Sequence, residues 1–172
     1  MSDSRSYPFE GTEPTIHEDA HVSREAVVVG DVRVEADASV WPGVVIRGDV
    51  GSVRIGRGSH VGDNTTVHAS EVGEAVMVGH SSVLNDATVG DHALVGFNAV
   101  VNTDVRIGAR SVVAAGTTIQ ESRDVPRESF VRGVPARVTP LAETDLDVDE
   151  IFESYSSGAY TDLARRHDAL FE

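Results

Sequence analysis

The chain carries an aliphatic residue at an almost unbroken spacing of six from Ile16 to Ile119, a period that belongs to neither an ordinary helix nor an ordinary strand. Four residues after each of these positions comes Ala, Val, Ser or Thr, with Glu71 and Arg123 as the exceptions. A six-residue unit with one large and one small inward side chain is typical of a parallel β-helix. Three units close one triangular coil, so the pattern predicts about six coils. The large positions are Ile16, Val22, Val28, Val34, Val40, Ile46, Ile55, Val61, Val67, Val72, Val78, Leu84, Val89, Val95, Val101, Ile107, Val113 and Ile119.

A length of 172 residues predicts a single domain, since stacked coils bury one continuous core. We expect a lead-in over residues 1–15, the β-helix over 16–122, a connector over 123–148 and a C-terminal α-helix over 149–172, lying along a flank of the coils. Pro126, Pro135 and Pro140 argue against a helix or a central strand in the connector. Apolar residues at helical spacing after residue 150 predict the final helix.

The formal charge is -14, and all 14 basic residues are arginines. This balance argues against binding to nucleic acid or to an anionic membrane, because both favour basic patches. We favour a halophilic protein, whose acidic surface keeps it soluble at high ionic strength. An acidic docking surface is the alternative.

The chain contains no cysteine, which excludes disulfides and thiolate metal ligands. Residues 1–11 are polar and lack the apolar core of a signal peptide, and no stretch is apolar enough to span a membrane. We therefore expect a soluble, cytoplasmic protein.

Four polar residues directly follow aliphatic positions that the repeat assigns to one face: Arg47, His68, Asn85 and Asn102. We call them the polar column. Neighbouring strands lie about 4.8 Å apart, so the side chains of His68 and Asn85 can converge on one ion. His80 belongs to the preceding face, up to about 16 Å along the chain from Asn85. A site that includes His80 therefore requires a neighbouring copy of the chain, as in a closed homotrimer.

Several stretches carry a distinctive set of motifs: SVWPGVVIRGDVGSVRIG from Ser39, VGDNTTVH ending at His68, VGHSSVLNDATVGDHALVG from Val78, and GVPARVTPL from Gly133. This set resembles the gamma-class carbonic anhydrases and their close relatives over most of the chain. The resemblance implies a left-handed β-helix, a homotrimer, and a metal ion, zinc or iron, at each subunit interface. It also implies a small-molecule substrate, carbon dioxide or bicarbonate.

Carried over position by position, the resemblance assigns the three metal-binding histidines of the family to His68, His80 and Asn85. Two positions match and Asn85 departs. The family glutamine that positions bicarbonate falls on Gly62, a second departure, whereas Asp63 matches. Arg47 and Asp49, which match as well, are sufficiently explained as an ion pair that fixes the trimer.

Three neutral imidazoles leave a tetrahedral metal with one open position and bring the pKa of a bound water to about 7. An asparagine oxygen is a weaker and harder ligand, so Asn85 should lower the affinity for zinc or iron. Asp63 could orient a substrate or stabilise a turn. Asp63 and Arg47 are the candidate catalytic residues. Trp41 and Phe97 fit packing roles, and we expect the remaining histidines, including His167, at the surface.

Three functions stay open. The first is a metal-dependent hydratase that interconverts carbon dioxide and bicarbonate. The second is a non-catalytic structural or assembly protein on the same scaffold, which Gly62 and Asn85 favour. The third is a hexapeptide-repeat acyltransferase, although such enzymes typically present a catalytic histidine from a long loop, and the longest insertion here is three residues.

Overall fold

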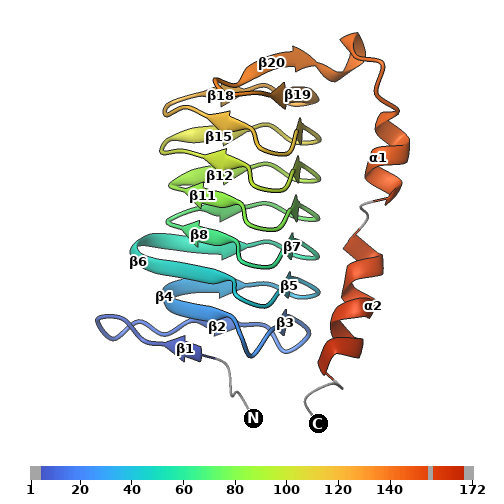
Figure 1. The fold of residues 1–172 in the computed structure, drawn as a ribbon. Coiled ribbons are helices and arrows are strands. Elements are labelled where there is room, and N and C mark those ends of the chain that lie inside the picture. The colour runs from blue at the N-terminus through green and yellow to red at the C-terminus, as the bar shows by residue number, and fades with distance from the viewer. Residues whose placement is uncertain (1–4, 155–156, 169–172) are drawn as a thin grey trace.

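The computed structural model describes residues 5–154 and 157–168, and it confirms the predicted parallel β-helix. Short strands alternate with tight turns and stack into a three-sided column (Figure 1). The strands are β1 (Arg5–Tyr7), β2 (Thr15–Ile16), β3 (His21–Val22), β4 (Val27–Val34), β5 (Ser39–Val40), β6 (Val45–Ile55), β7 (His60–Val61), β8 (Thr66–His68), β9 (Glu71–Val72), β10 (Met77–Val78), β11 (Val83–Asn85), β12 (Ala87–Val89), β13 (Leu94–Val95), β14 (Val100–Val101), β15 (Val105–Ile107), β16 (Val112–Val113), β17 (Thr118–Ile119), β18 (Asp124–Val125), β19 (Ser129–Arg132) and β20 (Arg137–Pro140).

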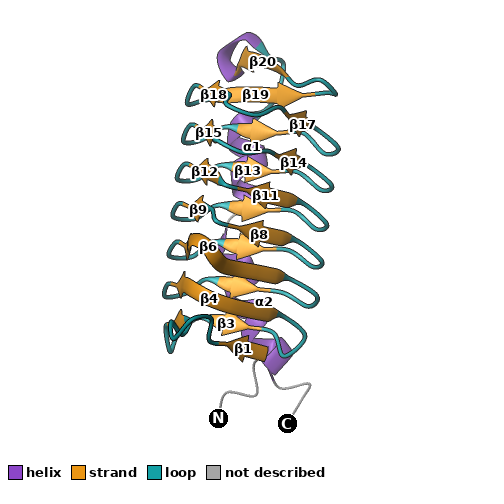
Figure 2. Ribbon diagram, turned by 90° about the vertical axis from the view of Figure 1, so that its left-hand side faces the viewer, coloured by secondary structure: helices purple, strands orange, loops and turns teal. Residues whose placement is uncertain are grey.

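The three faces of the column are parallel ladders that each take one strand from every coil. One face runs β3-β5-β7-β10-β13-β16-β19, so the column has seven coils rather than the predicted six. The other two faces run β1-β4-β6-β8-β11-β14-β17 and β2-β4-β6-β9-β12-β15-β18. They are joined because β4 and β6 are long enough to continue around a corner (Figure 2).

The interior is filled by the aliphatic positions of the repeat. Ile46, Val67, Leu84, Val101 and Ile119 pair in register on successive coils, and each is fully buried. Stacking like on like leaves no room for water between coils, and burial of one such side chain contributes about 1.5–3 kcal/mol. The repeat therefore dictates both the register and the core.

The small inward positions differ from the prediction where the spacing of six is broken. Val50, expected to face inward, is 82% exposed, and Val53 is buried in its place. In the two five-residue units, Ser70 and Ala87 are buried one position earlier than the rule of four predicts. A unit that gains or loses residues in its turn must shift its second inward residue to keep the strands in register.

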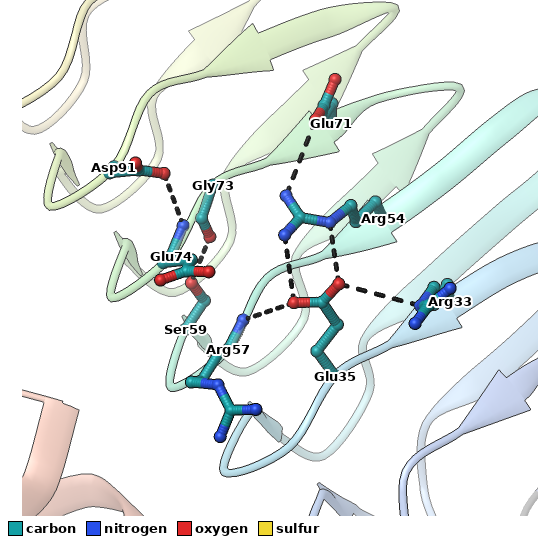
Figure 3. Close-up of polar contacts among 9 residues, drawn as sticks. All are labelled: Arg33, Glu35, Arg54, Arg57, Ser59, Glu71, Gly73, Glu74 and Asp91. Atoms are coloured by element: carbon teal, nitrogen blue, oxygen red, sulfur yellow. Dashed lines mark hydrogen bonds and ion pairs between the residues drawn. The ribbon is translucent and has the colours of Figure 1, made fainter.

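Polar contacts on one corner tie neighbouring coils together (Figure 3). The guanidinium of Arg54 donates to both carboxylate oxygens of Glu35, over 2.9 and 3.0 Å, and lies 3.6 Å from Glu71 on the next coil. The hydroxyl of Ser59 donates to the carbonyl oxygen of Gly73 over 2.6 Å. Such contacts satisfy polar groups that the stacking would otherwise bury unpaired.

The strands continue beyond residue 122, contrary to the expectation that the prolines exclude them. β18 and β19 extend the ladders as parallel strands, and β20 folds back antiparallel on β19. Pro126 lies between two strands and Pro140 ends β20, positions that need no backbone donor. The hairpin covers the open edge of the last coil on this face.

The C-terminal region forms two helices where one was expected over residues 149–172. A short 3-10 helix, η1 (Leu141–Glu143), precedes α1 (Val148–Ser154) and α2 (Ser157–Asp168), while residues 169–172 lie outside the described part. Both helices lie along one flank of the column, as predicted (Figure 1), and α2 contacts β3 and β5. No described helix is both long and apolar enough to cross a membrane.

Candidate metal site on the outer faces of the coils

The polar column forms as the repeat predicts. Arg47 pairs with His68 between β6 and β8, and His68 pairs with Asn85 between β8 and β11. Each side chain follows a buried aliphatic residue, so it points away from the core. Asn102, on the next coil, donates from Nδ2 to the carbonyl oxygen of Ile119 over 2.8 Å, which ties it to the backbone rather than to Asn85.

The imidazole of His68 is held on both sides. Its Nδ1 lies 3.1 Å from Oδ1 of Asn85, and its Nε2 lies 3.0 Å from Oδ1 of Asp49. Both partners are oxygen acceptors, so both contacts are hydrogen bonds only when both ring nitrogens carry a proton. The amide nitrogen of Asn85 donates in turn to Oγ1 of Thr103 over 2.9 Å, which fixes the amide orientation.

Asp49 joins the arginine to the histidine. Nε and Nη2 of Arg47 both donate to Oδ2 of Asp49, over 3.1 and 2.8 Å, and this leaves Oδ1 for His68. The hydrogen bonds from Arg47 are the largest cause that lowers the pKa of Asp49, and desolvation opposes them. The carboxylate is therefore ionised at neutral pH, and Arg47 and Asp49 pair within one chain.

His80 is oriented by Asp63 and lies apart from this network. Its Nδ1 accepts a hydrogen bond from the backbone N–H of Asp63 over 2.9 Å and lies 2.6 Å from Oδ2 of the same residue. The ring stacks on Phe97, with centroids 5.2 Å apart and planes tilted by 16°. One nitrogen cannot accept from the backbone N–H and donate to the carboxylate at the same time, so the two contacts are alternatives that depend on the tautomer. When Nδ1 carries the proton and donates to Asp63, Nε2 is left unprotonated, which is the usual arrangement of a carboxylate-oriented metal-binding histidine.

Gly62 is required by the position of His80. A Cβ atom at residue 62 would lie 2.8 Å from Nδ1 of His80 and 2.9 Å from its backbone nitrogen. Both distances are below van der Waals contact, so no side chain fits at residue 62 unless His80 moves. A glutamine at residue 62 is therefore incompatible with the position that His80 takes against Phe97.

The structure brings His68 and Asn85 together, as predicted, and groups His80 with Asp63. Among the described residues of one chain, no three histidine or acidic side chains converge as metal ligands. The polar contacts of His80 are with Asp63, whereas those of His68 are with Asn85 and Asp49.

One prediction about the remaining histidines is wrong. His60 is only 3% exposed, with its ring 5.4 Å from that of Trp41 and 4.5 Å from that of Tyr160 on α2. Burial is the main reason that the pKa of His60 falls to about 3, and a smaller contribution comes from His80. His167 packs edge-on against Trp41 with centroids 4.9 Å apart. The histidines at this flank thus belong to the contact with α2.

A seven-coil parallel β-helix with outward polar residues in register defines the class of hexapeptide-repeat proteins. Residues 86–121 match the family model described as bacterial transferase hexapeptide (six repeats). The crystal structure of a hexapeptide transferase family protein from Anaplasma phagocytophilum superposes with a TM-score of 0.87 at 29% identity, over 96% of this chain and 98% of that one.

Two curated relatives narrow the class. Gamma carbonic anhydrase 1, mitochondrial, of Arabidopsis thaliana is 32% identical over 91% of this chain and 60% of its own length. Carnitine operon protein CaiE of Salmonella agona is 34% identical over 93% of this chain and 82% of its own length. The chain spans about three fifths of the length of the plant relatives, 60% and 58%. The protein belongs to the gamma-carbonic-anhydrase-like family of hexapeptide-repeat proteins.

Proposed function

We propose that the protein is a homotrimer with a divalent metal site at each subunit interface, formed by His68 and Asn85 of one chain and His80 of the next. We propose further that the site hydrates carbon dioxide reversibly, more slowly than a site with three histidines. The observation that carries the proposal is the 2.6 Å contact between Nδ1 of His80 and the carboxylate of Asp63, because a proton on Nδ1 that is donated to this carboxylate leaves Nε2 free to bind a metal.

The residues fit a metal of reduced affinity. His80 is already oriented, and Asn85 contributes a neutral oxygen that suits zinc or iron less well than an imidazole does. His68 must release one of its two hydrogen bonds, to Asn85 or to Asp49, before one of its nitrogens can bind a metal. Metal affinity should therefore rise with pH, because the ligating nitrogen has to lose its proton.

A divalent metal held by these residues supplies Lewis acidity, which lowers the pKa of water toward neutrality. The chain supplies the surroundings. Asp63 orients His80, and Asp49 and Arg47 hold His68 from the opposite side. Gly62 provides no side chain to position bicarbonate, which is the second reason to expect slow turnover.

The test is elemental analysis of the purified protein combined with stopped-flow kinetics of carbon dioxide hydration, for the wild type and for Asn85→His. The proposal predicts substoichiometric zinc or iron and slow hydration in the wild type, and at least a tenfold gain in hydration rate for Asn85→His. His68→Ala should remove both metal and activity. A wild type with no measurable hydration, even with added zinc or ferrous iron, would contradict the proposal.

A second candidate is a non-catalytic structural or assembly protein. It is favoured by the same hydrogen bonds that close both nitrogens of His68, since this network is complete without a metal. If Asn85→His gains both metal and activity while the wild type has neither, this candidate is preferred. A hexapeptide acyltransferase is supported by the transferase-like neighbour in fold, and saturable turnover of acetyl coenzyme A would identify it.

A further inference from the structure

A cavity of about 250 Å³ lies between the coils and the two C-terminal helices. Its floor is an outward-facing row on the face β7-β10-β13-β16, where Met77 pairs with Leu94 and Leu94 with Val112. Ile151 of α1 and Tyr160 of α2 line it from the helix side. The cavity is separate from the network of Arg47, Asp49 and His68.

One row of small residues on the coils runs along the wall of the cavity. The residues that directly follow the buried valines of this face are Trp41, Gly62, Gly79, Gly96 and Ala114. Trp41 is buried where α2 lies against the coils. Higher in the column Gly79, Gly96 and Ala114 line the cavity. A Cβ atom at Gly79 would lie 2.7 Å from Cδ1 of Phe97, and one at Gly96 would lie 2.5 Å from the backbone nitrogen of Ala115, so the next coil allows no side chain at either glycine. Along this row the wall of the cavity is therefore formed by backbone at Gly79 and Gly96 and by the small side chain of Ala114.

Aromatic rings bound the cavity near its lower end. His60 and Tyr160 lie 4.5 Å apart, and His80 and Phe97 stack with their centroids 5.2 Å apart. All four rings line the cavity, together with the thioether of Met77, and sulfur and ring edges both favour contact with another aromatic ring. The remaining walls are aliphatic and no arginine or lysine lines the cavity, so a carboxylate would lose its hydration without gaining an ion pair to either.

We propose that this cavity binds a small, uncharged aromatic molecule, a single ring with a short substituent. The size supports this class, because an apolar cavity of about 150 Å³ in another protein binds benzene. The net charge of -14 further disfavours an aromatic carboxylate. Because His80 and Phe97 form part of the wall, the bound ring lies against the imidazole that we propose as the metal ligand of the neighbouring subunit. Binding itself requires no metal.

The test is a fluorine NMR titration of the full chain with fluorobenzene, with 4-fluorobenzoate as the charged comparison. The proposal predicts saturable binding of fluorobenzene at one site per chain, in the presence or absence of EDTA, and at least tenfold weaker binding of 4-fluorobenzoate. Ala114→Leu fills the cavity and should weaken fluorobenzene binding at least tenfold. Ala142→Leu, the same substitution at an exposed residue of η1, should leave it unchanged.

Ile151→Phe fills the cavity from α1 and leaves the coils intact, so it provides the same test if Ala114→Leu disturbs the fold. Circular dichroism shows which variants remain folded. The proposal is overturned if the wild type shows no saturable binding, as it would if a second copy of the chain filled the cavity. It is also overturned if both filling variants bind as well as the wild type, or if 4-fluorobenzoate binds as tightly as fluorobenzene.

Discussion

Asn85 is the direct cross-strand neighbour of His68, with its Oδ1 3.1 Å from Nδ1 of the imidazole. The two residues therefore contact each other in the isolated chain before any metal is considered. In this arrangement Asn85 acts as a hydrogen-bond partner that orients His68. Its effect on a shared metal site then comes from two sources, the weaker amide ligand and the hydrogen bond that metal binding must break.

His60 predicts a loss of stability on acidification. Its pKa is lowered from 6.5 to about 3 in the folded chain, mainly by burial, so the unfolded chain takes up the proton first as the pH falls. The free energy of unfolding is therefore unaffected by protonation of His60 above about pH 6.5, and it decreases as the pH falls from there toward about pH 3. Between about pH 7.5 and about pH 5, this one group should lower the free energy of unfolding by about 2 kcal/mol.

Urea denaturation of the wild type and His60→Phe at both pH values measures this contribution. The variant should lose about 2 kcal/mol less than the wild type over the same interval. His17→Phe, at an exposed histidine, is the matched control and should retain the full decline of the wild type. If the free energy of unfolding falls equally in the wild type and in His60→Phe, the side chain of His60 is not buried in solution.

Arg54 should stabilise the coils through its fork-shaped contact with Glu35. Arg54→Lys keeps the charge but loses the two parallel hydrogen bonds, so we expect a loss of about 0.5–1 kcal/mol in the free energy of unfolding. Arg106→Lys is the control, because Arg106 is 71% exposed and lies 3.9 Å from Asp124. A larger loss for Arg106→Lys than for Arg54→Lys would contradict this account.

The same contact has a defined pH dependence. The hydrogen bond from Arg54 lowers the pKa of Glu35, so the contact stabilises the folded chain above the ordinary carboxyl pKa and is lost as the pH falls through the lowered value. The difference between wild type and Arg54→Lys should therefore shrink in strong acid.

Gly62→Gln should fail to restore a bicarbonate-positioning side chain. The new Cβ atom would collide with Nδ1 and the backbone nitrogen of His80, at 2.8 and 2.9 Å, so the imidazole must leave its contact with Asp63. We expect a loss of about 1–3 kcal/mol in stability, measured by thermal denaturation, and no gain in hydration rate. If the variant is as stable as the wild type and hydrates carbon dioxide faster, then His80 occupies another position in the assembled protein.

The acidic surface predicts stabilisation by salt. A net charge of -14 without a single lysine implies self-repulsion that mobile ions screen. The melting temperature should rise as potassium chloride is increased from about 0.1 M to about 2 M, because added salt screens the repulsion between surface carboxylates. A melting temperature that stays flat or falls over this range would argue against the halophilic interpretation and favour an acidic docking surface.

The repeat in the sequence was sufficient to predict the parallel coils and the pairing of His68 with Asn85. Regular spacing places Val67 and Leu84 in register, and the residues that follow them, His68 and Asn85, must then be neighbours. The spacing failed at its interruptions, where Val53 replaces Val50 in the core, since the turn conformation decides which residue points inward. It also missed β18, β19 and β20, because prolines between strands or at strand ends cost no hydrogen bond.

The burial of His60 could not be read from the repeat either. The repeat places His60 on the outside of a coil, and only the packing of α2, through Tyr160, turns that outside into an interior. The sequence does place His21, Trp41 and His60 on this flank, where they contact one another. Their meaning depended on which face the helix covers, and helical periodicity alone does not determine that face.

The most direct test of the shared site is native mass spectrometry of the purified protein after incubation with zinc, for the wild type, His68→Ala and His80→Ala. The account predicts a trimer that binds up to three zinc ions in the wild type, and the loss of that zinc in either variant while the trimer persists. A monomeric protein, or a trimer in which His80→Ala retains its zinc, would contradict a metal site formed between subunits.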